Sequence, residues 1–365
     1  MPGRPATENR VLACKRDLYH ALYRLAAFEA LDDLGERLAS LYHSDATWRG
    51  SHPLNEMRGV DAILDTVWSP LRHAFPDLER RDLIFVGGTY EERDMVAAMG
   101  HYCGTFRDDW LGIPATGRPV YIRYGEVHHV EDGRIAQSWC LWDVLDVIRQ
   151  AGFWPIAPSL GTEEMWPGPI TADGIVLEAQ DPEESADSIR RVLAMHGALA
   201  NFDDEDVLDR TALLNMPQKH HWHPKMMWYG PAGIGTTRGL QGFVDFHQLP
   251  FRVAFPNRQG GDQWNDHPEL KRKFGGGHYI HVGDGPYAVT GGWPSVYAMH
   301  RGGDFAGVGP TGREITMRVM DFYLLHEGLI RENWVPLDML DVLMQMDVDV
   351  LDRMRSHFRR AAWAG

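Results

Sequence analysis

Two aspartates, each four residues after a tryptophan, first suggest chemistry in this chain. Asp143 follows Trp139 and Asp338 follows Trp334, and each residue recurs 195 positions later (334 − 139 and 338 − 143). A carboxylate against an apolar wall has a raised pKa, which lets it carry protons near neutral pH. Because the offset is shared, we interpret the two stretches as copies of one unit with an acid at the end of its last strand.

Further acids and aromatic residues are predicted beside these aspartates. The dipeptide 132–133, Asp-Gly, predicts a two-residue hairpin turn in which Glu131 pairs with Arg134. Counting back along both strands puts Glu126 opposite Trp139, and alternation then groups every second residue on one face. A one-residue slip of register would move the set to the other face. The predicted face holds Tyr124, Glu126, His128, Gln137, Trp139 and Asp143 in the first copy, and Asp321, Tyr323, Glu332, Trp334 and Asp338 in the second.

Histidines supply the second group of candidates. His43 and His223 lie at equivalent joints between a helix and a strand, where each is either a general acid/base at the rim of a site or a cap of the preceding helix. His221 and His223 would point the same way on a strand, as a pair of metal ligands does. However, no acid lies at a familiar spacing, and the first copy keeps only His43, so we expect no metal. The remaining residues expected to line the site are His221, His300 and Trp228.

Matched residues elsewhere support the duplication. His43 and Trp48 recur 180 positions later, whereas Tyr102 recurs 195 positions later. A net insertion of 15 residues (195 − 180) between Pro256 and Tyr297 reconciles the two offsets. We therefore predict a first domain over 1–155, a proline-rich linker over 156–184, and a second domain over 185–365 with an insertion around 258–285.

The elements that must position these residues follow one order. Apolar residues at helical spacing cover 11–42, and a further helix is predicted from Met57 to Phe75, where Pro76 stops it. Strand-like segments follow near 79–87, 94–106, 119–130 and 134–143. A second helical pattern begins near Glu184 and introduces the repeat. The order indicates two α+β units, each with helices first and a sheet after them.

Three motifs resemble a known family. Phe75-Pro76-Asp77 ends a helix, residues 112–118 read Gly-Ile-Pro-Ala-Thr-Gly-Arg, and residues 132–135 read Asp-Gly-Arg-Ile. With the closing Trp139 and Asp143, this order resembles the SnoaL-like polyketide cyclases of the nuclear transport factor 2-like superfamily. The resemblance implies two tandem cone-shaped α+β barrels, each a curved antiparallel sheet packed on helices.

The same resemblance implies catalysis without a cofactor by an aspartate on the last strand, and Asp143 and Asp338 match that position. The second copy departs from the pattern: Met299-His300 replaces Gly104-Thr105, and Pro336 falls inside the predicted last strand. The superfamily includes isomerases, dehydratases, lyases and binding proteins, so the fold does not choose the reaction.

Composition excludes several classes of function. The net charge of −15 argues against nucleic acid or a membrane surface as partner. The cysteines, Cys14, Cys103 and Cys140, lack CxxC spacing, which favours a reducing compartment. The N-terminus lacks a signal-peptide pattern and no window has about 20 apolar residues, so we expect a cytoplasmic protein.

The predicted function is an acid/base enzyme without organic cofactor, of lyase, dehydratase, cyclase or isomerase type, acting on a small to medium organic substrate. One alternative is a non-catalytic small-molecule-binding or scaffold protein, in which large apolar residues would fill one of the two sites. The other is a metal-dependent hydrolase or oxygenase built on His220, His221 and His223. The two copies are expected to pair as a pseudo-dimer within the chain, and further homo-oligomerisation is left open.

Overall fold

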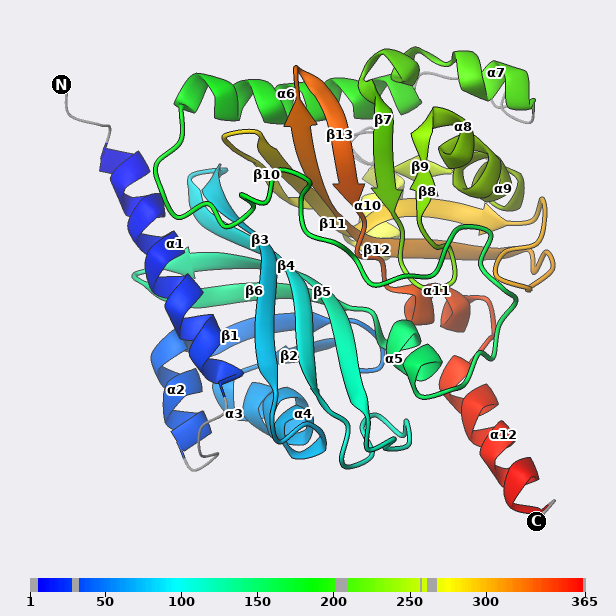
Figure 1. Cartoon of the computed structure of the whole chain (residues 1–365), viewed down its shortest axis with the longest axis horizontal. Coiled ribbons are helices and arrows are strands. Elements are labelled where there is room, and N and C mark those ends of the chain that lie inside the picture. The colour runs from blue at the N-terminus through cyan, green and yellow to red at the C-terminus, as the bar shows by residue number, and fades with distance from the viewer. Residues whose placement is uncertain (1–5, 28–32, 201–208, 257, 261–267, 364–365) are drawn as a thin grey trace. The chain divides into compact units, whose positions relative to one another are not determined.

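A computed structural model describes residues 6–27, 33–200, 209–256, 258–260 and 268–363 (Figure 1). The chain divides into two compact units, and each has the α+β architecture predicted from the sequence. The proline-rich segment predicted as a linker contributes residues to both. The first unit holds Met1–Phe153, Pro167–Gln180 and Met354–Gly365, and the second holds Trp154–Trp166 and Asp181–Arg353.

The first unit begins with helices and ends with an antiparallel run of long strands. The helix predicted over 11–42 is two helices, and β1 begins at Tyr42. The sheet has the order β2-β1-β6-β5-β4-β3. The elements are α1 (Ala6–Leu25), α2 (Leu34–Leu41), β1 (Tyr42–Gly50), β2 (Glu56–Arg58), α3 (Val60–Ile63), the π-helix η2 (Leu64–Trp68), α4 (Ser69–Ala74), β3 (Glu79–Tyr90), β4 (Arg93–Thr105), β5 (Pro119–Glu131), β6 (Arg134–Trp142) and α5 (Val144–Gln150).

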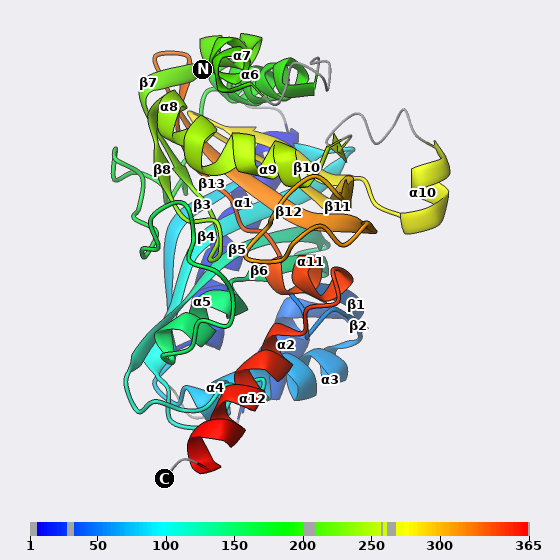
Figure 2. The same cartoon turned by 90° about the vertical axis from the view of Figure 1, so that its right-hand side faces the viewer.

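The second unit repeats this order, including a π-helix at the equivalent place. Its helices are α6 (Pro182–Ala200), α7 (Arg210–Asn215), the 3-10 helix η4 (Pro217–His220), α8 (Gly239–Phe243), the π-helix η5 (Val244–Gln248), α9 (Leu249–Ala254), α10 (Pro268–Phe274) and α11 (Met339–Gln345), and α12 (Val350–Trp363) closes the chain. Its strands are β7 (Trp222–Tyr229), β8 (Thr237–Arg238), β9 (Gln259–Gly260), β10 (His278–Asp284), β11 (Tyr287–His300), β12 (Arg313–His326) and β13 (Leu329–Trp334). In Figure 2, α8, η5 and α9 follow one another as one continuous helix.

The second sheet has the order β10-β11-β12-β13-β7-β8, with β9 added on β11. Of the insertion predicted around 258–285, residues 261–267 lie outside the described residues. Pro336, expected inside the last strand, comes after β13, where its carbonyl accepts a hydrogen bond from the amide of Met320 (3.0 Å).

One strand pair in each sheet departs from the predicted antiparallel pattern. β1 runs parallel to β6, with Trp48 in register with Ser138. β7 runs parallel to β13, with Trp228 in register with Asn333. The sheets are therefore mixed, and the first strand of each unit supplies a large aromatic side chain beside the last strand.

A β-bulge corrects the predicted pairing of the first hairpin. Glu131 pairs with Arg134 as predicted, but Ala136 has no partner, so Val127 and not Glu126 lies opposite Trp139. The extra residue moves the rest of β6 by one position, which reverses the face of every later side chain. The prediction that Gln137 and Trp139 share a face with Tyr124, Glu126 and His128 is therefore wrong. Their place is taken by Ser138, Cys140 and Trp142.

The second hairpin has the same bulge, at Arg331. Tyr323 consequently pairs with Asn333, and the predicted grouping of Glu332 and Trp334 with Asp321 and Tyr323 is also wrong. Their position on the opposite face has the same cause, one unpaired residue early in the last strand.

The face that carries Trp142 is the inner face of the first sheet, because it packs on the helices. The Trp142 ring meets Trp68 of η2 and Trp48 of β1 edge-on, with centroids 6.4 and 5.9 Å apart. Tyr102 of β4 meets both Trp68 and Trp142 (6.0 and 5.4 Å). These rings fill the space between sheet and helices in the first unit.

Candidate functional site

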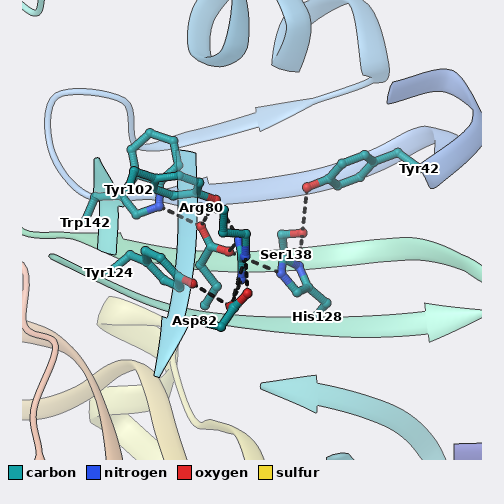
Figure 3. A network of polar contacts seen from close by, with 9 residues as sticks. Tyr42, Arg80, Asp82, Tyr102, Tyr124, His128, Ser138 and Trp142 are labelled. Atoms are coloured by element: carbon teal, nitrogen blue, oxygen red, sulfur yellow. Dashed lines mark hydrogen bonds and ion pairs between the residues drawn. The ribbon is translucent and has the colours of Figure 1, made fainter. Parts of the chain in front are cut away.

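A polar network lies on the inner face of the first sheet (Figure 3). Glu126 is its centre: Arg80 donates to one carboxylate oxygen (2.6 Å), and Tyr102 and Trp142 donate to the other (2.9 and 2.8 Å). The Glu126 side chain is 2% exposed. Burial raises the pKa of Glu126, but the charge of Arg80 and the nearby His128 outweigh it and hold this pKa well below its usual range.

Arg80 joins this carboxylate to a second one. Its guanidinium lies 2.8 Å from a carboxylate oxygen of Asp82, which also accepts a hydrogen bond from Tyr124 (2.6 Å). Burial lowers the pKa of Arg80, but the two carboxylates raise it well above its ordinary value. Arg80 also lies over the Tyr124 ring at 4.5 Å. Glu126 is thus ionised, paired with Arg80 and buried, so it has no proton to exchange near neutral pH.

His128 extends the network toward β1. One ring nitrogen is 2.8 Å from the hydroxyl of Ser138, which donates to Tyr42 (3.4 Å), and the other is 3.7 Å from Glu126. The side chains of His128 and Glu126 and the residues Ser138 and Tyr42 are each at most 2% exposed. The network is a structural core of charged and polar groups.

The same positions in the second sheet carry smaller side chains. The pairing of Val319 with Leu337 matches that of Tyr124 with Trp142, and Asp321 stands where Glu126 does. Val319, Asp321 and Leu337 are partly exposed, whereas their first-unit counterparts are buried. The inner face beside Asp321 thus has two aromatic rings and one methylene group fewer than its first-unit counterpart, and its residues are more exposed.

Among the described residues, the hydrogen-bond partners of Asp321 are uncharged. Asn333 donates to its carboxylate (3.2 Å), and Tyr323 forms a further hydrogen bond with it. The hydroxyl of Tyr323 also lies 2.9 Å from a ring nitrogen of His196 on α6. Among the described residues no cation pairs with this carboxylate. Burial raises the pKa of Asp321 to about 6, and the hydrogen bonds offset only part of that effect.

The predicted bases Asp143 and Asp338 are helix caps in the structure. Asp143 accepts from the backbone amide of Asp146 (3.0 Å) and from buried Arg123 (2.7 Å). Asp338 does the same with the amide of Asp341 (3.2 Å) and with Arg318 (3.0 Å). Both follow the last strand, so neither shares the inner face as predicted. The predicted role in proton transfer is untested, and the contacts are those of an anchor.

In the described part of the chain, the predicted site histidines make no contact with Glu126 or Asp321. These histidines are His43, His221 and His223. His43 contacts the carbonyl of Glu131 at the hairpin turn (2.9 Å). His223 accepts a hydrogen bond from the backbone amide of Lys225 (3.0 Å). His221 is partly exposed, and burial lowers its pKa. Among the described residues, no three His, Cys, Asp or Glu side chains come together as a metal site.

The other predicted contact residues divide between the two faces. Glu332 accepts from Tyr229 (2.9 Å), and Trp334 stacks on the same tyrosine, both on the outer face. His300 is buried, with its ring nitrogens 3.2 Å from Thr311 and 3.0 Å from the carbonyl of Gly303. On the outer face of the first unit, Gln137 and Trp139 both contact Arg49. Trp228 and Tyr323 lie on the inner face beside Asn333.

The sequence analysis missed several members of these networks. Arg80 and Asp82 are two positions apart, the spacing that puts strand residues on one face. Ser138 and Asn333 are separated by the 195-residue offset, so the repeat itself could have pointed to them. His196 on α6 had no such signal.

Residues 19–151 match the model of the family described as SnoaL-like polyketide cyclase. The resemblance predicted from the sequence is confirmed for residues 19–151, and the second unit repeats the same strand order, so the chain holds two α+β folds in tandem. The match to this family supports a fold of the kind that cofactor-independent cyclases and isomerases use. It also supports an enzymatic role. Among the described residues, no helix is long and apolar enough to cross a membrane.

Solved structures with similarity to part of the chain include three bacterial proteins. IdmH from Streptomyces antibioticus, proposed to be a polyketide cyclase, is 25% identical over 38% of this chain and 99% of its own, with a TM-score of 0.30. TsrD from Streptomyces laurentii is 23% identical over 38% and 96%, with a TM-score of 0.32. A nuclear transport factor 2-like protein from Burkholderia pseudomallei is 16% identical over 39% and 98%, with a TM-score of 0.29. No curated protein matches the sequence.

The cap geometry predicts a structural cost for losing Asp143. Asp143→Ala removes the helix cap and the nearer of two carboxylates beside Arg123, whose side chain is 1% exposed, and leaves Asp146 at 3.5 Å, so it should lower the free energy of unfolding by about 2–4 kcal/mol. Asp338→Ala should cost less, about 1–2 kcal/mol, because the Arg318 side chain is 20% exposed. Urea denaturation followed by circular dichroism measures both. A stable Asp143→Ala protein that has lost activity would instead favour the catalytic role.

Neutralising the equivalent carboxylates of Asp321 and Glu126 should change the free energy of unfolding in opposite directions. Asp321 has a pKa near 6 folded and 3.8 when unperturbed, so its ionisation costs stability above pH 6 and nothing below about pH 4. Asp321→Asn should therefore stabilise the protein at pH 8, by about 2–3 kcal/mol, and the gain should vanish at low pH. The pKa of Glu126 is depressed, so Glu126→Gln should destabilise at pH 8 and less as pH falls. Urea denaturation across this pH range tests the pair, and equal signs would contradict the assignment.

Proposed function

We propose that the second unit carries the chemistry, as an acid/base enzyme without organic cofactor in which Asp321 removes and returns a proton. The supporting observation is the contrast between equivalent carboxylates. Glu126 is sealed and paired with Arg80, whereas Asp321 is partly exposed and paired with no cation among the described residues. Burial of an uncompensated carboxylate costs stability, and such groups concentrate at functional sites.

The acidity of Asp321 suits proton transfer near neutral pH. With a pKa of about 6, the side chain is mostly ionised at pH 7 and accepts a proton, and its acid form is strong enough to return one. Asn333 holds the carboxylate in place, and the linked Tyr323 and His196 offer a route for a proton to or from α6. The reaction types that begin with this step are cyclisation, isomerisation, elimination and lyase cleavage.

The substrate class follows from what such a base can do. An aspartate of this acidity removes a proton from carbon only where a neighbouring carbonyl stabilises the carbanion, so we expect a small to medium organic carbonyl compound. The match to the SnoaL-like polyketide cyclase family lies in the first unit, and the second unit shares its strand order, which agrees with cyclase or isomerase chemistry on this fold.

For the first unit we favour the scaffold role. Its inner face is filled by Trp48, Trp68, Trp142 and Tyr102, each at most 2% exposed. A site occupied by its own side chains has no room for a substrate. This arrangement fits the alternative in which large residues fill one of two duplicated sites.

Proton abstraction can be assayed without the natural substrate. Wild-type protein in D2O should exchange the α-protons of at least one member of a panel of aryl β-keto esters, followed by 1H NMR, with a rate that falls below a midpoint near pH 6. Asp321→Asn should reduce the rate about 100-fold or more. Tyr102→Phe, which removes one hydrogen bond from Glu126 in the first unit, is the matched control and should leave the rate unchanged. Full exchange by Asp321→Asn would refute the proposal.

A further inference from the structure

We propose that His247 is a second substrate-contacting residue of the second unit, where its imidazole N–H donates a hydrogen bond to the carbonyl oxygen of the substrate that Asp321 deprotonates. This inference rests on the proposed function, because it assigns the group that faces the other end of the same substrate.

His247 is the polar member of an aromatic stripe. Phe243, His247, Phe251 and Phe255 recur every four residues along α8, η5 and α9, with successive ring centroids 5.3, 5.5 and 5.1 Å apart. The residues 180 positions earlier are Ile63, Val67, Leu71 and Phe75, and all four are buried. A stripe selected for packing alone would carry another apolar side chain at position 247.

The sheet register places His247 beside the inner face that holds Asp321. Trp228 on β7 is in register with Asn333 on β13, so the two side chains share a face. Asn333 donates to Asp321 (3.2 Å). The His247 ring stacks on Trp228, with centroids 4.0 Å apart and planes 17° apart. A helix residue and a sheet residue thus approach the same interior from opposite sides.

The imidazole is held by carbon contacts and not by hydrogen bonds. Its ring is partly exposed, and neither nitrogen has a hydrogen-bond partner among the described residues. His300, by contrast, has both nitrogens engaged by Thr311 and Gly303. Polar atoms left without partners in a largely apolar setting cost stability unless water or a ligand meets them. The His247 ring, stacked on Trp228, can therefore donate its N–H to a ligand that binds beside Trp228.

The charge state suits a donor to a carbonyl. Burial, together with the charges of Arg258 and Arg252, lowers the pKa of His247 to about 3. The ring is consequently neutral at neutral pH and always carries one N–H. A neutral imidazole can polarise a carbonyl and forms no ion pair with a carboxylate base, which would quench the base.

The step balances within the substrate and these two residues. The C–H bond next to the carbonyl breaks, its proton moves to the carboxylate of Asp321, and the electron pair moves onto the carbonyl oxygen. The oxygen's developing negative charge is met by the His247 hydrogen bond. Return of the proton to another carbon, or attack of the enolate carbon on a second carbonyl, completes an isomerisation or a cyclisation.

Binding of 4-nitrophenolate, an enolate analogue with a delocalised oxyanion, tests the inference directly. Absorbance titration at pH 8 should show saturable binding to the wild type, and His247→Phe should weaken it about tenfold or more, since a hydrogen bond to a charged acceptor is lost. His247→Gln, which keeps an N–H donor, should recover most of the affinity. His326→Phe, at an exposed histidine of the same unit, is the control and should bind like wild type.

The outcomes separate this inference from the function it rests on. Asp321→Asn should bind the phenolate more tightly at pH 8, because a repelling carboxylate is gone. Weaker binding by His247→Phe together with no effect of Asp321→Asn would keep the His247 contact and refute the role of Asp321. A response to Asp321→Asn with unchanged binding by His247→Phe, or no saturable binding by the wild type, would refute the His247 contact.

Discussion

The ion pair between Arg80 and Glu126 is the interaction on which the contrast between the two halves depends. A carboxylate buried in this position is costly unless a cation compensates it. In the first unit Arg80 lies 2.6 Å from Glu126, and the surrounding rings close the interior. In the second unit the equivalent acid, Asp321, is partly exposed and has no cation partner among the described residues, and desolvation raises its proton affinity. One duplicated position thus serves stability in one unit and is available for chemistry in the other.

A second interaction, shared by both units, keeps the strand arrangement of the two sheets alike although the residues of their inner faces differ. After each last strand an aspartate caps the following helix and pairs with an arginine of the preceding strand, Arg123 with Asp143 and Arg318 with Asp338. In each unit a glutamine seven residues further on bonds the backbone of that strand as well, Gln150 to Tyr121 and Gln345 to Thr316. This anchor fixes the end of the sheet, so substitutions on the inner face leave the strand register intact. This shared anchor gives a structural reason for the recurrence of Asp143 and Asp338.

Much of this architecture could be predicted from the sequence, because repeats and turn signals are written in residue types. The offsets of 180 and 195, the Asp-Gly turn and the strand boundaries led to the α+β tandem. The face of each residue could not be predicted, because the bulges at Ala136 and Arg331 have no distinctive residue and each reverses the alternation. Glu126 and Asp321 were predicted as site residues from the sequence. The difference in their pKa and exposure could not be predicted, because it depends on Arg80, Trp142 and Leu337, which come from other strands and loops.

The pKa of Asp321 in the folded protein is the quantity that tests this account most directly. It can be measured by following the side-chain carboxyl 13C resonance of aspartate-labelled protein with pH, with the Asp321→Asn variant identifying the signal. Because no described cation compensates the Asp321 carboxylate, we expect a midpoint near 6. A midpoint at or below the ordinary value of 3.8 would contradict it, because Asp321 would then be as compensated as Glu126.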